Sequence, residues 1–177
     1  MIIYQVKKGV DIMALSDILD IAEKFEIEGY NFYKSKRDEI RSSTAKETFD
    51  FLANMEKEHT EYIRRVKEKI ENVEVVETND SETTEEFFEK RLKSQKLDES
   101  FSKENDLADL SILRMALLIE KDFVNYYAKA YETTVDEKAK KIFKMLKNWE
   151  EQHVKLVEEL IKEIYDRNRL DLGFYPF

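Results

Sequence analysis

Hydrophobic residues recur every three or four positions along most of this chain, the spacing that places side chains on one face of an α-helix. The chain has only three glycines and one proline in 177 residues, so it has few helix breakers, and its composition gives no case for a sheet. The pattern predicts an all-α protein built around four long helices. Their expected ranges are 16–37, 44–72, 106–132 and 135–166.

Sequence signals also mark where these helices should begin. Residues 1–14 precede the first stripe and could form an extended N-terminal arm or an N-terminal extension, with Ser16 as the N-cap of the first helix. Thr44 and Thr134 each stand three residues before a glutamate, the spacing of a capping box. A single bundle domain is therefore expected over residues 15–166.

Two further segments lie outside the helical stripes. Residues 73–105 form a long crossover, in which the apolar pattern predicts a short helix near 85–97. Residues 167–177 form an apolar C-terminal tail that we expect to pack against something. A crossover of this length suits a connection along a bundle.

The second half of the chain repeats the first at a fixed offset. The only two histidines, His59 and His153, lie 94 residues apart, and each follows a glutamate by three positions. Another glutamate precedes each Glu-x-x-His unit by 30 residues. The repeat indicates two duplicated helical hairpins joined by the crossover. The same offset pairs Ala22 with Ala116, Tyr33 with Tyr127, Phe49 with Phe143 and Leu52 with Leu146.

Six polar residues of this repeat lie on the faces that should form the core. They are Glu26, Glu56, His59, Glu120, Glu150 and His153. Burying four carboxylates together would cost several kcal/mol each unless positive charge compensates. Lysine and arginine are missing from these stripes, so the pattern predicts two divalent cations with one imidazole for each ion. The same ligand set is a known rule for di-iron and di-manganese bundles.

The ligand types leave some alternatives open. Carboxylates with one imidazole per ion suit iron or manganese, and zinc could also occupy the site. Because glutamate is common in this chain, one Glu-x-x-His alone would more often be a solvated helix face. Tyr33 and Tyr127 lie two turns after a predicted ligand, either as core aromatics or as phenols that hydrogen-bond to a ligand carboxylate. Trp149 lies off the inner stripe and is interpreted as a packing residue.

Charge and composition exclude several functions. A net charge of −9 without a basic cluster argues against a nucleic-acid partner. The absence of cysteine excludes disulfides, iron–sulfur centres and thiol catalysis within these residues. The apolar runs are too short to span a membrane, and the N-terminus lacks the apolar core of a secretory signal. We therefore expect a cytoplasmic protein.

The segments Ala22–Tyr33 and Phe51–His59, with their repeats Ala116–Tyr127 and Glu150–His153, resemble the rubrerythrin-like branch of the ferritin-like superfamily. The resemblance covers roughly residues 15–165. It implies a ferritin-like four-helix bundle with a non-haem di-iron centre that reacts with peroxide or dioxygen. Full-length rubrerythrins add a rubredoxin-like domain, for which this chain lacks the cysteines. The best-known peroxide-reducing members also carry an extra carboxylate at the position that is Phe123 here.

The leading hypothesis is a di-iron oxidoreductase, a peroxidase in the broad sense, that reduces hydrogen peroxide or dioxygen. Its electrons would come from a separate donor, either rubredoxin-like or a flavoprotein. One alternative is an iron-handling protein with ferroxidase-type uptake, and another is a structural metal site that only stabilises the bundle. The apolar tail favours a homodimer, and the resemblance also implies one, because proteins of that family commonly oligomerise.

Overall fold

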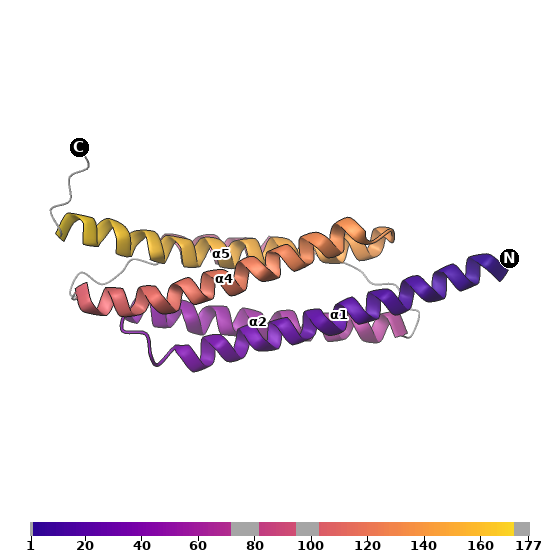
Figure 1. The fold of residues 1–177 in the computed structure, drawn as a ribbon, viewed down its shortest axis with the longest axis horizontal. Helices are drawn as coiled ribbons and strands as arrows, with labels where there is room; N and C mark the ends of the chain where they lie inside the picture. The colour runs from indigo at the N-terminus through magenta and orange to yellow at the C-terminus, as the bar shows by residue number, and fades with distance from the viewer. Residues whose placement is uncertain (1, 72–81, 95–102, 172–177) are drawn as a thin grey trace.

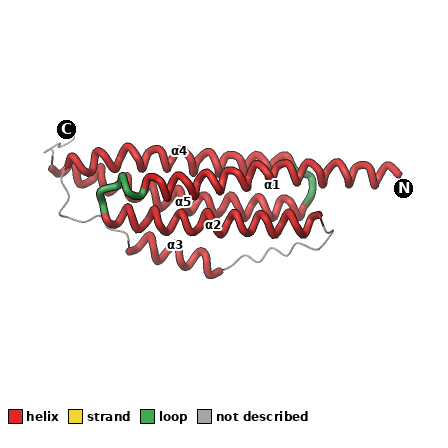
Figure 2. Tube along the Cα trace, turned by 90° about the horizontal axis from the view of Figure 1, so that it is seen from below, coloured by secondary structure: helices red, strands yellow, loops and turns green. Residues whose placement is uncertain are grey.

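The computed structural model describes the backbone of residues 2–71, 82–94 and 103–171, and the side chains of 15–70, 86, 88–94 and 104–168. The long helices α1 and α2 pair as one hairpin, and α4 and α5 pair as the other (Figure 1). The shorter α3 lies outside the four long helices (Figure 2). This arrangement confirms the predicted all-α bundle of two hairpins. The helices are α1 Ile2–Lys36, α2 Ser43–Glu71, α3 Glu82–Ser94, α4 Lys103–Thr133 and α5 Glu137–Asp171.

The first helix begins much earlier than the sequence pattern indicates. Helix α1 runs without a break from Ile2, so Ser16 lies inside the helix and does not cap it. The backbone of residues 2–14 is helical, and an extended arm is therefore wrong for this segment. The N-terminal end of α1 projects beyond the other long helices (Figure 1). None of these residues is a proline, so no helix-breaking residue of that kind interrupts the segment.

The N-caps of two helices differ from the predicted capping boxes. Ser42 caps α2, since its Oγ accepts a hydrogen bond from the backbone N–H of Ala45 at 3.3 Å. Asp136 caps α5, and its Oδ1 accepts the N–H groups of Lys138 and Ala139 at 2.7 and 2.9 Å. Both caps lie just outside the first helical residue, where free N–H groups need acceptors. The predicted caps at Thr44 and Thr134 were wrong.

A carboxylate of the second hairpin also reaches the start of α2. Asp109 on α4 is buried and accepts the backbone N–H groups of Arg41 and Ser42 at 2.6 and 2.8 Å. These bonds tie the turn of the first hairpin to the side of the second. They therefore fix how the two hairpins lie along each other.

The described side chains form two hydrophobic clusters, with buried polar residues between them. One cluster includes Phe49, Leu52 and Leu113, and the other includes Leu19 and Phe143. Each predicted inner stripe contributes to both clusters, one on either side of its glutamate. The buried glutamates therefore lie near mid-length of the bundle, with apolar packing toward both ends.

Two predictions concern segments at the edges of the described chain. The short helix of the crossover is present as α3, between 82 and 94. The tail was expected from residue 167, but α5 continues to Asp171. Residues 172–177 lie outside the described residues. The predicted packing of the tail, and the dimer that it favours, therefore stay predictions. Among the helices that are described, none combines the length and hydropathy needed to cross a bilayer.

Candidate metal centre

The four long helices bring all six predicted residues into one cluster. Helices α1 and α4 each contribute one glutamate, and α2 and α5 each contribute a glutamate and a histidine one turn later. Each of the six residues is at most 1% exposed. The six residues are Glu26, Glu56, His59, Glu120, Glu150 and His153.

The first half of the cluster surrounds His59. Its Nδ1 lies 3.3 Å from Glu26 Oε2, 3.6 Å from Glu56 Oε2 and 3.2 Å from Glu150 Oε1. These three carboxylates come from three different helices. The imidazole nitrogen therefore faces a small space lined by oxygen atoms.

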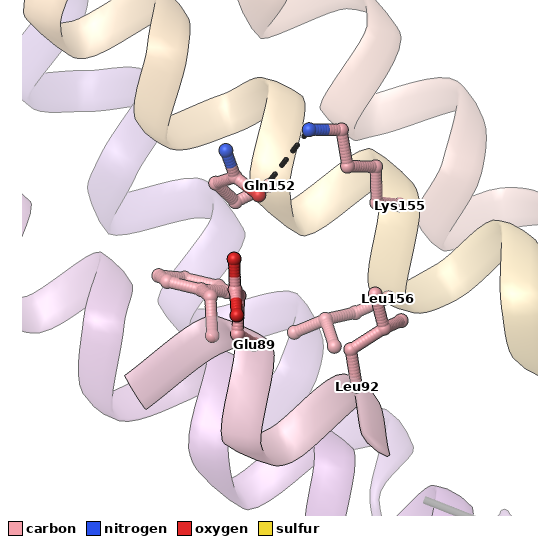
Figure 3. Close-up of a pocket in the computed structure, with 6 residues that line it drawn as sticks. Glu89, Leu92, Gln152, Lys155 and Leu156 are labelled. Carbon is pink, nitrogen blue, oxygen red and sulfur yellow. Dashed lines mark hydrogen bonds between the residues drawn. The ribbon is translucent and has the colours of Figure 1, made fainter. Parts of the chain in front are cut away.

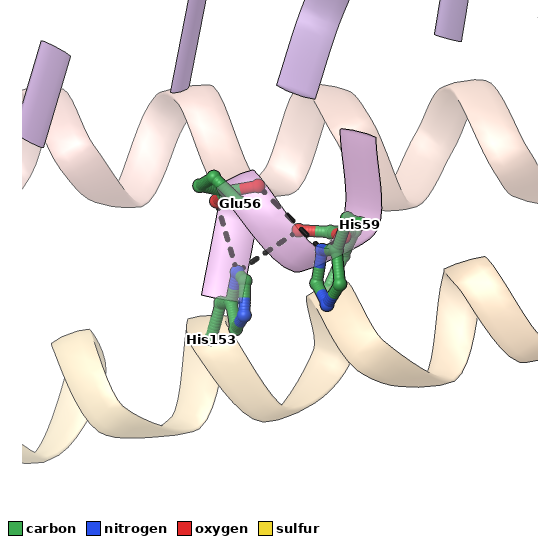
Figure 4. A group of neighbouring side chains, drawn as sticks. Glu56, His59 and His153 are labelled. Atoms are coloured by element: carbon green, nitrogen blue, oxygen red, sulfur yellow. Dashed lines mark ion pairs between the residues drawn. The ribbon is translucent and has the colours of Figure 1, made fainter. Parts of the chain in front are cut away.

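The second half surrounds His153 in the same way. Its Nδ1 lies 3.3 Å from Glu120 Oε2, 3.1 Å from Glu56 Oε1 and 3.1 Å from Glu150 Oε2. Glu56 thus directs one oxygen to each histidine (Figure 4). Glu150 does the same. Two equivalent sets of potential metal ligands result, with Glu56 and Glu150 lying between them. Each set has one imidazole and one carboxylate that faces this imidazole alone. We call these two carboxylates, Glu26 beside His59 and Glu120 beside His153, the private carboxylates.

Two tyrosines connect the hairpins at the private carboxylates. The phenol of Tyr33 on α1 donates a hydrogen bond to Glu120 on α4. The phenol of Tyr127 on α4 donates to Glu26 on α1. Both rings are completely buried, so each serves the core and also holds one carboxylate oxygen. The remaining oxygen of each carboxylate faces a histidine.

Many buried oxygen and nitrogen atoms of the cluster form no hydrogen bond within the described part of the chain. Both oxygens of Glu56 and of Glu150, and Oε2 of Glu120, have no hydrogen-bond partner among the described residues. One donor atom each from Glu56, His59, Glu150 and His153 lie within 4.8 Å of one another. Buried polar atoms are rarely left in this state without a ligand. Convergent oxygen and imidazole atoms without hydrogen bonds fit two bound cations.

Without a cation, protons must balance the charge. Burial, followed by the charge of Glu150, raises the pKa of Glu56 well above its ordinary value. Burial also raises the pKa of Glu120 to about 7. Burial opposes the charged form of both histidines, but the surrounding carboxylates outweigh it and raise the pKa of His59 and His153. Metal binding would displace these protons.

The pKa of Glu150 moves in the other direction. Burial alone would raise it, but the positive charge of His153, together with that of His59, lowers the pKa below its ordinary value. This carboxylate lies between the two imidazoles and carries the negative charge that they require. Burial raises the pKa of Tyr33 and Tyr127 well above the usual range, and the neighbouring carboxylates add to this effect. The two phenols therefore remain hydrogen-bond donors at neutral pH.

The outer faces of the histidines are covered by rings that differ between the two halves. The indole of Trp149 stacks on His59 with ring centroids 4.6 Å apart and an interplanar angle of 12°. The ring of Phe88 on α3 lies 5.4 Å from that of His153. The Nε2 atoms of both histidines are buried and have no hydrogen-bond partner within the described structure. Packing against rings therefore holds the imidazoles in place.

A glycine and a phenylalanine close the α1–α4 side of the cluster. A Cβ added at Gly29 would lie 3.1 Å from Cε2 of Phe123 and 3.1 Å from Cδ of Glu56. Phe123 is 4% exposed, and its ring stacks on Phe25 at 5.2 Å. The absence of a side chain at position 29 therefore makes room for the phenylalanine beside the carboxylate.

A cleft of about 170 Å³ lies between α3 and α5 (Figure 3). Its lining combines apolar side chains, among them Phe88, with the polar Glu89, Gln152 and Lys155. Phe88 is 2% exposed and stands between the cleft and His153. The sequence pattern gave no sign of this contact, because α3 has no counterpart in the repeat.

The fold and the cluster together define a helical bundle with a buried Glu/His group that is typical of a di-iron site. The family model described as Rubrerythrin matches residues 17–161, so the chain belongs to the rubrerythrin family. The matched range includes all six clustered residues. Neither the comparison with curated proteins nor the comparison with solved structures found a match.

Proposed function

We propose that this protein is a di-iron oxidoreductase that reduces hydrogen peroxide or dioxygen with electrons from a separate donor. The observation that carries the proposal is the pair of equivalent donor sets with two carboxylates directed to both. Such a site is suited to two ions that act together on one small molecule. Family membership supports an oxidoreductase role for this arrangement.

Each part of the site has a defined task in this proposal. Glu26 and His59 would hold one iron ion, Glu120 and His153 the other, and Glu56 and Glu150 would lie between them. When bound, two iron ions would supply the two electrons that reduction of a peroxide requires. The burial of the cluster excludes bulk water, which strengthens electrostatic interactions inside the site.

The tyrosines have a positioning role in the same scheme. Each phenol holds one oxygen of a private carboxylate and leaves the other oxygen directed toward a histidine. Because burial keeps both phenols protonated, Tyr33 and Tyr127 fix the orientation of Glu120 and Glu26 in either charge state of the centre.

The test is anaerobic loading with iron(II), followed by stopped-flow absorbance with hydrogen peroxide and, separately, with dioxygen. We expect two iron ions per chain and rapid oxidation by at least one of the two oxidants. The variant Glu56→Gln should lose this reaction, while Glu58→Gln, which changes an exposed neighbour on the same helix, should retain it. Oxidation no faster than that of Glu56→Gln would contradict the proposal.

The same experiment separates the alternatives. Uptake of many more than two iron ions per chain would favour iron handling with ferroxidase-type uptake. Stable binding without reaction toward either oxidant, or zinc in protein from its native source, would favour a structural site.

A further inference from the structure

The surroundings of the two histidines break the symmetry of the cluster. The offset of 94 residues relates Trp149 to Met55, so the indole on His59 has no aromatic counterpart in the repeat. On the other side, the buried ring of Phe88 from α3 lies against His153. The two halves are therefore alike in their predicted ligands and different in what connects those ligands to the surface.

Trp149 begins a stack of three nearly parallel rings. Its indole lies 4.6 Å from the His59 ring at 12°, and the His59 ring lies 5.0 Å from the His153 ring at 10°. Trp149 is partly exposed, whereas both histidines are buried. The edge of Tyr62 packs on the indole at 5.3 Å and supports its orientation. The stack therefore runs from the protein surface to both halves of the cluster.

We infer that Trp149 is the entry point for electrons, which pass from an external one-electron carrier through the indole and the His59 ring to the centre. This inference rests on the proposed function, which requires reduction by a separate donor. No bond forms or breaks in the transfer, and the carrier is oxidised by one electron each time. Two such transfers and two protons from solvent balance the reduction of one hydrogen peroxide to two waters.

Competing routes in the described structure are less direct. Phe88, which covers the other histidine, is 2% exposed and belongs to a helix packed on the outside of the bundle. On the α1–α4 side, Phe123 is also buried, and its ring lies against Gly29 and Phe25. Among the described rings that pack on the two histidines, Trp149 is thus the one with partial exposure.

The test measures the reduction half-reaction alone. Iron-loaded protein is first oxidised with ferricyanide, so the measurement does not depend on reactivity with peroxide. Re-reduction by reduced methyl viologen is then followed by stopped flow in the wild type, Trp149→Leu, Trp149→Phe and the matched control Met55→Leu. We expect slow re-reduction in Trp149→Leu, an intermediate rate in Trp149→Phe and the wild-type rate in Met55→Leu.

Two readouts separate electron entry from simple packing. Cobalt(II) absorbance titrations should give the same stoichiometry and affinity in all four proteins. Since Trp149 is the only tryptophan, its fluorescence in the wild type and in Met55→Leu should fall as cobalt(II) binds beside His59. Unchanged re-reduction in Trp149→Leu would overturn the inference, and so would weakened cobalt(II) binding in that variant, because it would make Trp149 a packing residue. Normal re-reduction kinetics without peroxide or dioxygen reactivity would instead count against the proposed function.

Discussion

Gly29 offers a sharp test of how tightly the α1–α4 side of the centre is packed. The change Gly29→Ala would place a Cβ 3.1 Å from the Glu56 carboxyl carbon and 3.1 Å from the ring edge of Phe123. Ordinary carbon contacts are at about 3.5–4.0 Å, so both neighbours would have to move by several tenths of an ångström. Glu56 is held among the cluster residues, and Phe123 is held by its stack on Phe25.

The expected cost follows from two opposing effects. Overpacking of a core by one methyl group destabilises a protein by about 1–3 kcal/mol. Replacing glycine by alanine inside a helix returns about 0.5–1 kcal/mol. Because neither neighbour can move freely, we expect Gly29→Ala to lower the free energy of unfolding by about 0.5–2 kcal/mol. In a chain of this size, each kcal/mol corresponds to about 2–4 °C in Tm.

A double-mutant cycle with Phe123→Leu measures the contact itself. The shorter leucine lacks the ring atom that the added Cβ at position 29 would meet, so the cost of Gly29→Ala should fall in that background. A coupling of about 1 kcal/mol is expected for residues in direct contact. The assay is urea unfolding of the metal-free protein followed by circular dichroism, with Glu28→Ala at an exposed neighbour as the control for helix propensity. Equal stabilisation by Gly29→Ala in both backgrounds would refute tight packing at position 29.

Three further expectations concern the tyrosines, pH and the buried Asp109. Tyr33→Phe and Tyr127→Phe should each lower cobalt(II) affinity by about 10–100-fold in competition titrations, and unequal losses would argue against equivalent halves. The folded-state pKa of Glu120, about 7, exceeds its ordinary value of 4.5, so metal-free protein should lose stability as pH rises between these values. Thermal unfolding should show this loss, and metal-loaded protein should lack it. Asp109→Ala should cost about 1–2 kcal/mol in urea unfolding, because it removes the acceptor of two backbone N–H groups, and Asp109→Asn should cost less, because Asn keeps one acceptor.

The hydrophobic pattern predicts the inner face of each helix because the side chains of one face recur at a fixed spacing. Glu26 and Glu120 could be identified in this way, since their neighbours one turn away are apolar and their burial follows from the shared face. The positions of Tyr33 and Tyr127 follow equally, and the structure shows which carboxylate each phenol contacts. Each phenol and its carboxylate partner belong to different hairpins, so their pairing depends on the angle between the helices, which a hydrophobic pattern does not predict.

Other features could not be deduced because they depend on contacts between distant segments. Asp109 and Ser42 are 67 residues apart, and their hydrogen bond forms only when the two hairpins lie side by side. Trp149 lies off the inner stripe, but its long side chain reaches His59 on the neighbouring hairpin. One signal was present in the sequence, because the repeat pairs this tryptophan with a methionine. Phe88 had no such signal, since the crossover has no repeated counterpart.

The duplication has different consequences for binding and for reaction. Equivalent donor sets give two cations similar surroundings, which favours binding both of them. In the proposed function, reaction with a small oxidant and reduction by a larger carrier would have opposite needs, because the first requires exclusion of water and the second requires contact with the surface. In the proposed function, the departures from symmetry would meet both needs, since Phe123 fills the space beside Gly29 on one side while Trp149 packs on His59 and is partly exposed on another. A perfectly repeated chain would have the same residue type at positions 29 and 123, and the same type at 55 and 149, so it could not separate these roles.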